Sequence, residues 1–246
     1  MNNSLGNDEM QLVDINDDDN SIDSCSEYFA STVRLNEEAM IRLRDKDPTL
    51  TGLDISVYQN IDWENDGIYI AENKNLKSLY LSGYSREQPN KENVNSLLRA
   101  ISCNRSIRCV NFDNNIGDTG DMIRIIMPFF QNNTNLRTLH VSQLEMDDES
   151  VQLLSSALTS CGSLRRLDIH FRVISNMSAG KIVASLGMGL RKLTLLFYMN
   201  NTGNQWCIEL GKLLQNPTSM LEELNLSNNQ ICTDGAIVLG GCISPE

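Results

Sequence analysis

The sequence predicts an α/β solenoid in which parallel strands form an inner sheet and helices pack on its outer side. Three observations indicate this fold class. An apolar pattern recurs every 26 to 31 residues. In each copy, apolar residues first recur at every second position, as in a strand, and then about every 3.6 residues, as in a helix. A short strand followed by a helix at fixed spacing makes successive strands parallel neighbours. We count about seven copies in one folded domain.

The best copy of the repeat spans Leu221–Leu239. Its strand places Leu224 and Leu226 on one face, and Asn229 follows three residues later. The Asn229 amide can satisfy backbone groups in the turn after the strand, which burial would otherwise leave unpaired. Every copy starts at an apolar residue, with further apolar residues three and five positions on. These strand starts are Leu50, Leu76, Ile107, Leu136, Leu164, Leu190 and Leu221.

Residues that favour helix N-caps stand at one position of the repeat behind the strand. They are Asp148, Asn176, Thr202 and Thr233, with Asp118 in a fifth copy if one residue is missing before it. Apolar residues follow each of them at helical spacing, as expected of a helix that packs on the sheet. In the first repeat we expect Asp62 to cap a helix that bears Trp63.

Repeats of this length and pattern resemble the ribonuclease-inhibitor class of leucine-rich repeat, in which the sheet curves into a horseshoe. The segments DPTLTGLDIS and DWENDGIYIAENKNLKSLYL, which follow one another from Asp47 to Leu81, are similar to leucine-rich-repeat proteins of diatoms and related algae. The resemblance implies the fold and assigns no activity.

The sequence divides into an acidic tail, residues 1–35, and a repeat domain, residues 36–246. Residues 1–30 hold eight acidic residues and no Lys or Arg, so they carry -8 of the net charge of -12 and leave -4 for the rest. Low hydrophobicity and one sign of charge predict disorder. The tail is either a solubilising extension or a docking element for a basic partner. Residues 36–47 predict a helix that caps the first repeat, and the repeats run from residue 50.

No polar closing repeat follows the last predicted helix, which starts at Thr233. An uncapped terminal repeat exposes apolar surface. We consider three alternatives: the domain ends abruptly, the chain is part of a longer array, or a partner or second copy covers this edge. We favour the last two.

Several classes of function are disfavoured by the composition. The seven cysteines contain no CxxC pair, so we expect reduced thiols. A secretory signal and a segment long enough to span a membrane are both lacking, which predicts an intracellular protein of the cytoplasm or nucleus. The sequence has no phosphate-binding glycine motif and no complete metal motif, its pI is near 4.6, and its Lys and Arg are scattered. We therefore expect no cofactor, no metal, no nucleic acid and no membrane contact.

The candidate binding residues lie on the open face, by which we mean the sheet face opposite the helices, concave in a horseshoe. Strand alternation selects them, because side chains that point away from the core have no helix to pack on. They are Tyr80, Asn111, Asp113, Thr138, His140, Arg166, Asp168, His170, Lys192, Thr194, Glu223 and Asn225, with Tyr198 beside them. His140 and Asp168 occupy the same position in neighbouring repeats.

Two interpretations of this surface differ in chemistry. His140, Asp168 and His170 could form a metal or acid-base site, but an open surface has no pocket that excludes water. The favoured interpretation is a polar patch for protein contact, because interfaces favour amphipathic and charged side chains of this kind.

We therefore predict a non-catalytic scaffold that binds a protein partner on the open face. The first alternative is a regulator of a small GTPase, since the repeat class resembles the fold of Ran GTPase-activating proteins. In those proteins the acidic segment lies at the other end of the repeats, and their functional residues have no match here. The second alternative is a substrate-recognition part of a ubiquitin ligase, although no F-box-like helical segment fits before Asn36.

Overall fold

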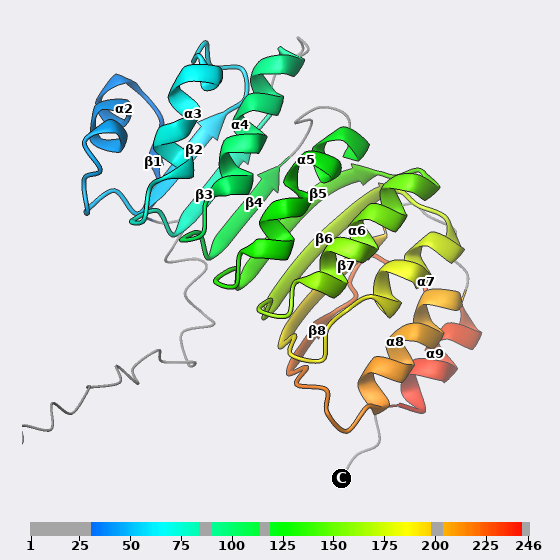
Figure 1. Cartoon of the computed structure of the whole chain (residues 1–246). Helices are drawn as coiled ribbons and strands as arrows, with labels where there is room; N and C mark the ends of the chain where they lie inside the picture. The colour runs from blue at the N-terminus through cyan, green and yellow to red at the C-terminus, as the bar shows by residue number, and fades with distance from the viewer. Residues whose placement is uncertain (1–30, 84–89, 114–118, 198–203, 243–246) are drawn as a thin grey trace, which may run out of the picture.

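The computed structural model describes residues 31–83, 90–113, 119–197 and 204–242, and it shows an open parallel sheet with helices along one side (Figure 1). Within these residues the strands follow one another in chain order, each pairing in parallel with the next. The strands are β1 (Val33–Arg34), β2 (Gly52–Ser56), β3 (Ser78–Ser82), β4 (Cys109–Asp113), β5 (Thr138–Glu145), β6 (Arg166–Val173), β7 (Lys192–Phe197) and β8 (Glu223–Asn225). The protein is an α/β solenoid, as the repeat spacing predicts.

A helix follows each strand and returns the chain to the start of the next one. The helices are α2 (Glu37–Arg44), α3 (Trp63–Ala71), α4 (Lys91–Cys103), α5 (Thr119–Asn132), α6 (Asp148–Ser160), α7 (Asn176–Ala184), α8 (Gln205–Gln215) and α9 (Thr233–Gly240). Consecutive strands therefore start at one edge of the solenoid, where the helices end. Figure 1 shows α3 to α9 side by side on the same side of the sheet.

The core is a set of rows that run across the strands. The register aligns Leu139 of β5 with Leu167 of β6 and Leu193 of β7, and each is at most 1% exposed. A second row two residues on, Val141, Ile169 and Leu195, is buried in the same way. Burial of apolar rows between sheet and helices is the main force that holds the repeats together.

Helix N-caps show where the sequence prediction was one residue off. Asp62 and Asn36 cap α3 and α2, each accepting a hydrogen bond from a backbone N–H three residues on. The caps of α6 and α7 are Asp147 and Ser175. The predicted Asp148 and Asn176 are instead the first helical residues, because the cap needs extended backbone and a side chain that reaches back to the first turn.

Two further helix starts differ from the prediction. Thr233 is the first residue of α9, and Cys232 occupies its cap position without a side-chain hydrogen bond. The cap position of α8 is Asn204. The predicted caps Thr202 and Asp118 lie outside the described residues.

The turns from helix to strand are held by a series of buried amides. Asn104 is fully buried, and its Nδ2 donates to the carbonyls of Ile70 and Asn73 in the preceding repeat at 2.7 and 2.8 Å. Its Oδ1 accepts from the backbone N–H of Ser106 at 2.7 Å. Asn73 and Asn133 make the same local bond two residues on. These amides satisfy backbone groups that would otherwise be buried and unpaired.

The first repeat is covered differently from the prediction. The sequence predicts that the tail ends at residue 35, but Val33 of β1 pairs with Leu53 of β2, and Leu35 is only 2% exposed. An apolar strand edge is covered at lower cost by another strand, which also pairs its backbone groups, than by a helix alone. The helix α2 begins at Glu37, within the range in which the sequence predicts one.

The last repeat is the least buried. Leu221, Leu224 and Leu226 are only partly buried, although their equivalents in the interior strands are in the core. In α9, Ile237 is 67% exposed. No helix among the described residues has the length and apolar character needed to cross a membrane.

Candidate functional site on the open face

The register brings most of the predicted open-face residues into two lateral rows. The central row places His140 beside Asp168 and Asp168 beside Thr194. It continues to Tyr80 and Asn111 on one side and to Asn225 on the other. The first row contains Thr138, Arg166, Lys192 and Glu223. The rows exist because parallel strands about 4.8 Å apart stack equal repeat positions.

Asp168 is the centre of the surface. It is 7% exposed, and its Oδ2 accepts a hydrogen bond from Arg166 Nε at 2.9 Å. His140 Nδ1 lies 3.8 Å from the same oxygen. Two-residue alternation along β6 puts Arg166, Asp168 and His170 on one face, and the register adds His140 from β5. We call Asp168, Arg166, His140, His170 and Thr194 the Asp168 cluster.

The electrostatics of Asp168 favour its ionised form. Burial alone raises the pKa of a carboxyl group, because the charged form loses solvation. Hydrogen bonds from His140 and Thr194 and the charge and hydrogen bond of Arg166 outweigh this effect and hold the pKa of Asp168 at about 2. At neutral pH the carboxylate is therefore a fixed negative charge that orients its cationic neighbour.

The two histidines contact each other as well as Asp168. The ring centroids of His140 and His170 are 5.1 Å apart with an interplanar angle of 78°, an edge-to-face arrangement. His140 and His170 are both half-buried. The predicted meeting of the two histidines on one surface is therefore present.

A second charged pair flanks the cluster. Lys192 Nζ lies 3.0 Å from Glu223 Oε1. The Lys192 side chain is 12% exposed, whereas the Glu223 side chain is 64% exposed. Arg166 and Lys192 are register neighbours, and each pairs with a carboxylate, Arg166 with Asp168 and Lys192 with Glu223. The surface thus offers both signs of charge at fixed positions.

Part of the predicted set lies elsewhere. Thr138 is 5% exposed, and Ser78 and Cys109 in the same row are also buried. The expectation that open-face side chains stay outside the core is therefore wrong for this row in the first four repeats. The side chains are small enough for neighbouring strands to close over them, as at Gly52, where an added Cβ would meet Ser78 Oγ at 2.4 Å.

Three other predicted residues are not part of the Asp168 cluster as the structure describes it. Asn225 is exposed and accepts a hydrogen bond from the Ser227 backbone N–H at 2.9 Å, so it shapes its own turn. Tyr198 and the side chain of Asp113 lie outside what the structure describes. The tail residues 1–30 lie outside it too.

The metal interpretation has no support in the geometry. Across the described parts of the chain, no group of three or more His, Cys, Asp or Glu side chains could hold a metal ion. His140 faces the Asp168 carboxylate, which already pairs with Arg166. The positive charge of Arg166 disfavours a metal cation at the same carboxylate. What the arrangement can do is present ordered donors and acceptors to a partner surface.

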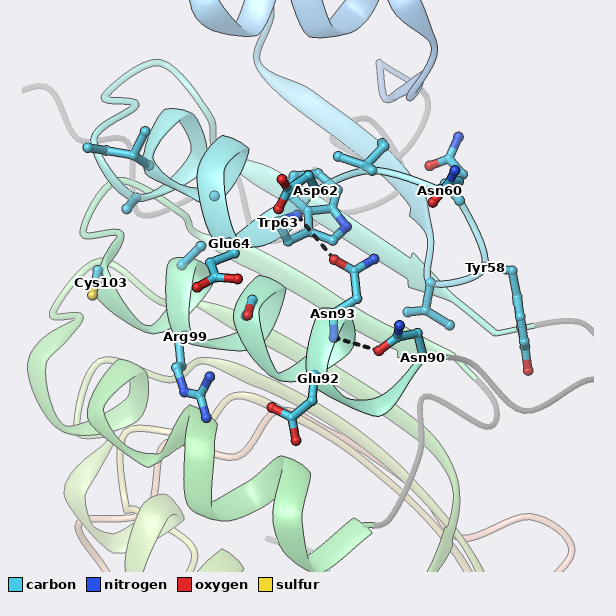
Figure 2. Close-up of a pocket in the computed structure, with 18 residues that line it drawn as sticks. Tyr58, Asn60, Asp62, Trp63, Glu64, Asn90, Glu92, Asn93, Arg99 and Cys103 are labelled. Atoms are coloured by element: carbon cyan, nitrogen blue, oxygen red, sulfur yellow. Dashed lines mark hydrogen bonds between the residues drawn. The ribbon is translucent and has the colours of Figure 1, made fainter.

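A cleft that the sequence did not predict lies between α3 and α4 (Figure 2). It has a volume of about 1100 Å³, and Trp63, Glu64, Glu92, Asn93 and Arg99 are among its lining residues. Asn93 Oδ1 accepts from the Trp63 backbone N–H at 3.1 Å, and the Asn93 N–H donates to Asn90 Oδ1 at 3.1 Å. Figure 2 draws polar side chains at the cleft, and those of Asn90 and Asn93 accept hydrogen bonds from the first turns of helices. A structural role at the helix starts therefore accounts for part of the polar lining.

Comparisons with known proteins find similarity among solved structures alone. No family model matches the chain, and no curated protein matches it. Among solved structures, the tropomodulin C-terminal domain of Caenorhabditis elegans is 12% identical, with 84% of this chain and 89% of that chain covered and a TM-score of 0.37. The actin-binding site 2 of leiomodin-1 is 13% identical, with 72% and 86% covered and a TM-score of 0.36. At this similarity neither assigns a partner.

Proposed function

We propose that the protein is a non-catalytic scaffold that binds a protein partner on the open face, centred on the Asp168 cluster. The observation that supports it is the ordered, partly buried charge arrangement of the cluster on an otherwise helix-free sheet surface. Side chains that are already fixed lose little conformational entropy when a partner binds. A rigid sheet presents them at set spacings, which favours specificity.

The composition of the surface fits a protein partner. Arg166, the two histidines and Tyr80 are amphipathic side chains of the kind that concentrate at the centres of interfaces. Arg166 is 34% exposed in its side chain, so a partner can reach the guanidinium group while Asp168 holds its orientation. The partner that fits is a protein segment with at least one carboxylate, which would reach Arg166 and Lys192 together.

Affinity capture with a charge-reversed open face tests the proposal. The variant is Arg166→Glu with Lys192→Glu in the full chain, and the expected result is loss of a captured partner with an unchanged circular dichroism spectrum. The matched control is Lys181→Glu with Lys212→Glu, which makes the same change in net charge on α7 and α8. Because Arg166→Glu adds a charge beside Asp168, the milder His140→Ala variant is measured as well. A partner retained by both open-face variants contradicts the proposal.

The two alternatives from the sequence are tested separately. Stimulated GTP hydrolysis by a small GTPase in the presence of the chain would favour the regulator hypothesis. Co-purification of ubiquitin-ligase subunits from a lysate would favour the substrate-recognition hypothesis.

The scaffold proposal includes an intracellular location, in the cytoplasm or nucleus. Fluorescence microscopy of the tagged chain in its source cells checks it.

A further inference from the structure

One edge of the solenoid, where helices end and strands begin, carries a row of cations. One cation stands directly before each of the strands β3 to β6: Lys77, Arg108, Arg137 and Arg165. A fifth, Arg191 before β7, already pairs with Glu222 at 3.1 Å. The backbone N–H groups of Arg108, Arg137 and Arg165 donate to the carbonyls of Lys77, Arg108 and Arg137, respectively, each at 2.8 Å. Cations that are 28 to 31 residues apart in the sequence are therefore neighbours in space.

Two more cations extend this row outward. Lys74 and Arg105 lie in the helix-to-strand turns before β3 and β4, and both are exposed. With Lys77 and Arg108 they line a cleft of about 610 Å³ at the same edge. We define the basic rim as these six residues: Lys74, Lys77, Arg105, Arg108, Arg137 and Arg165.

Helix ends account for only part of this charge. Lys77 Nζ donates to the Lys74 carbonyl at 3.0 Å, and Arg137 Nη1 donates to the Thr134 carbonyl at 2.9 Å, so both bind backbone groups in the turns that follow α3 and α5. Each helix end carries roughly half a negative charge, so α3 to α6 together supply roughly -2 against six full positive charges. In the described part of the chain, Lys77, Arg137 and Arg165 form no ion pair with a carboxylate. A positive excess is left for an anionic ligand.

The environment of Lys77 disfavours its charged form. Burial and, secondly, the charge of Arg108 lower the pKa of the Lys77 ammonium group. Like charges at this spacing are unfavourable unless something negative lies beside them. A negatively charged segment along the rim would relieve the repulsion.

The acidic segment of the same chain enters the fold at this edge. Val33 pairs with Leu53, and Thr32 lies beside Gly52, so residue 31 is level with Thr51 at the start of β2. The Thr51 carbonyl accepts the Lys77 N–H at 2.7 Å, which makes it the first member of the same backbone ladder. Residues 1–30, which precede this point, hold eight acidic residues and no Lys or Arg.

We infer that residues 1–30 bind along the basic rim of their own chain. Five strand spacings, about 24 Å, separate β1, where the segment enters the fold, from β6 at the far end of the rim. Asp17 to Asp19 lie 12 to 14 residues before Ser31, a contour of about 40 to 46 Å and a coil dimension of about 20 Å. The segment therefore reaches the whole rim without being fully extended. Covalent attachment gives it a high effective concentration that a free acidic partner lacks.

Lysine footprinting of two full-length chains tests the inference. The first chain is natural, and in the second Asp8, Asp14, Asp17, Asp18, Asp19 and Asp23 become Asn while Glu9 and Glu27 become Gln. We expect an acetylating reagent to modify Lys74 and Lys77 at least about threefold more slowly in the natural chain at low salt, since bound lysine is protected. About 0.5 M NaCl should remove the difference by screening. Lys181 and Lys212 on the helices are internal controls and should not change.

Carbodiimide cross-linking of the natural chain identifies the occupant. Equal amounts of unlabelled and ¹⁵N-labelled chain are mixed, and the expected cross-links join acidic residues of 1–30 to Lys74 or Lys77 within one isotope class. Mixed-isotope cross-links would show that a second copy supplies the segment, which overturns the intramolecular arrangement. Equal acetylation rates in the two chains would overturn the inference altogether and leave the rim to an acidic protein or a nucleic acid.

Discussion

The interior repeats and the last repeat share one sequence pattern but differ in burial. Leu167 in β6 is fully buried, whereas its register equivalent Leu224 in β8 is only partly buried. The difference comes from the neighbours: β6 pairs with β5 and β7, while β8 pairs with β7 alone among the described strands. A repeat pattern therefore specifies where an apolar side chain points, and the next repeat decides how much stability it contributes.

The largest effect is expected in the middle of the solenoid. Leu167→Ala removes a side chain from a closed row and should cost about 2 to 5 kcal/mol of unfolding free energy. Because repeats support mainly their neighbours, we also expect this variant to separate the unfolding of the two halves. Urea titration followed by both circular dichroism and tryptophan fluorescence checks it, since Trp63 and Trp206 lie in different halves. A single transition with little loss of stability would show that the register is wrong.

The buried amides extend the comparison to polar groups. Asn104→Ala removes the acceptor of the Ser106 and Ile107 backbone N–H groups and one of the donors to the Ile70 and Asn73 carbonyls. Each buried group left unsatisfied costs about 1 to 3 kcal/mol. The Asn216 side chain accepts local, exposed bonds from the Thr218 N–H and hydroxyl at the edge of the last repeat, so Asn216→Ala should cost less than about 1 kcal/mol. Thermal melts of the two variants measure the difference. Equal losses would contradict the proposed dependence on burial.

The pH dependence of stability should show the same contrast between an interior carboxyl group and one in the last repeat. The pKa of Asp168 is lowered from 3.8 to about 2, so its contribution of about 2 kcal/mol is present above pH 4 and is lost as pH falls toward 2. In the last repeat, Glu223 is largely exposed, and its pair with Lys192 should contribute at most about 1 kcal/mol.

Urea unfolding between pH 5 and pH 2.5 separates these contributions. Asp168→Asn should be less stable than the natural chain at pH 5 and should lose stability less steeply as the pH falls. Glu223→Gln should follow the natural curve. If Asp168→Asn keeps the full acid dependence, other carboxyl groups cause it.

The smallest effects belong to the last repeat. Sequence alone assigns Leu224→Ala the same cost as Leu167→Ala, and the partial burial of Leu224 lowers our expectation to about 1 kcal/mol. Ile237→Ala should change stability by less than about 0.5 kcal/mol, because this side chain is 67% exposed. Both variants are compared with Leu167→Ala in the same titration. Losses as large as that of Leu167→Ala would show that something covers the edge in solution.

Sequence periodicity was sufficient for the architecture. The order of the strands, the Asp62 cap and the role of Asn229 follow from it, and Asn229 Nδ2 donates to the Leu195 and Leu226 carbonyls. The strands β2 to β8 each begin two residues after the predicted start. The buried amides of the helix-to-strand turns were not predicted, although Asn73, Asn104 and Asn133 each stand five residues before the first residue of a strand. That signal lies outside the apolar pattern, which is why a search for leucines does not find it.

The surface was harder to predict than the core. Alternation correctly placed His140, Asp168 and His170 on one face, but it cannot show that Thr138 is buried, since that depends on the size of side chains in the neighbouring strands. The cations of the basic rim look scattered in sequence because one repeat length separates them. Only the strand register shows that they are adjacent.

Hydrogen exchange measured strand by strand tests the central claim, that stability in this solenoid depends on having a repeat on both sides. Peptide-level mass spectrometry should find the slowest exchange in β4 to β7 and clearly faster exchange in β8 and α9. Equal protection of β8 and β6 would contradict the account, because it would mean that the last repeat is held as firmly as the interior ones.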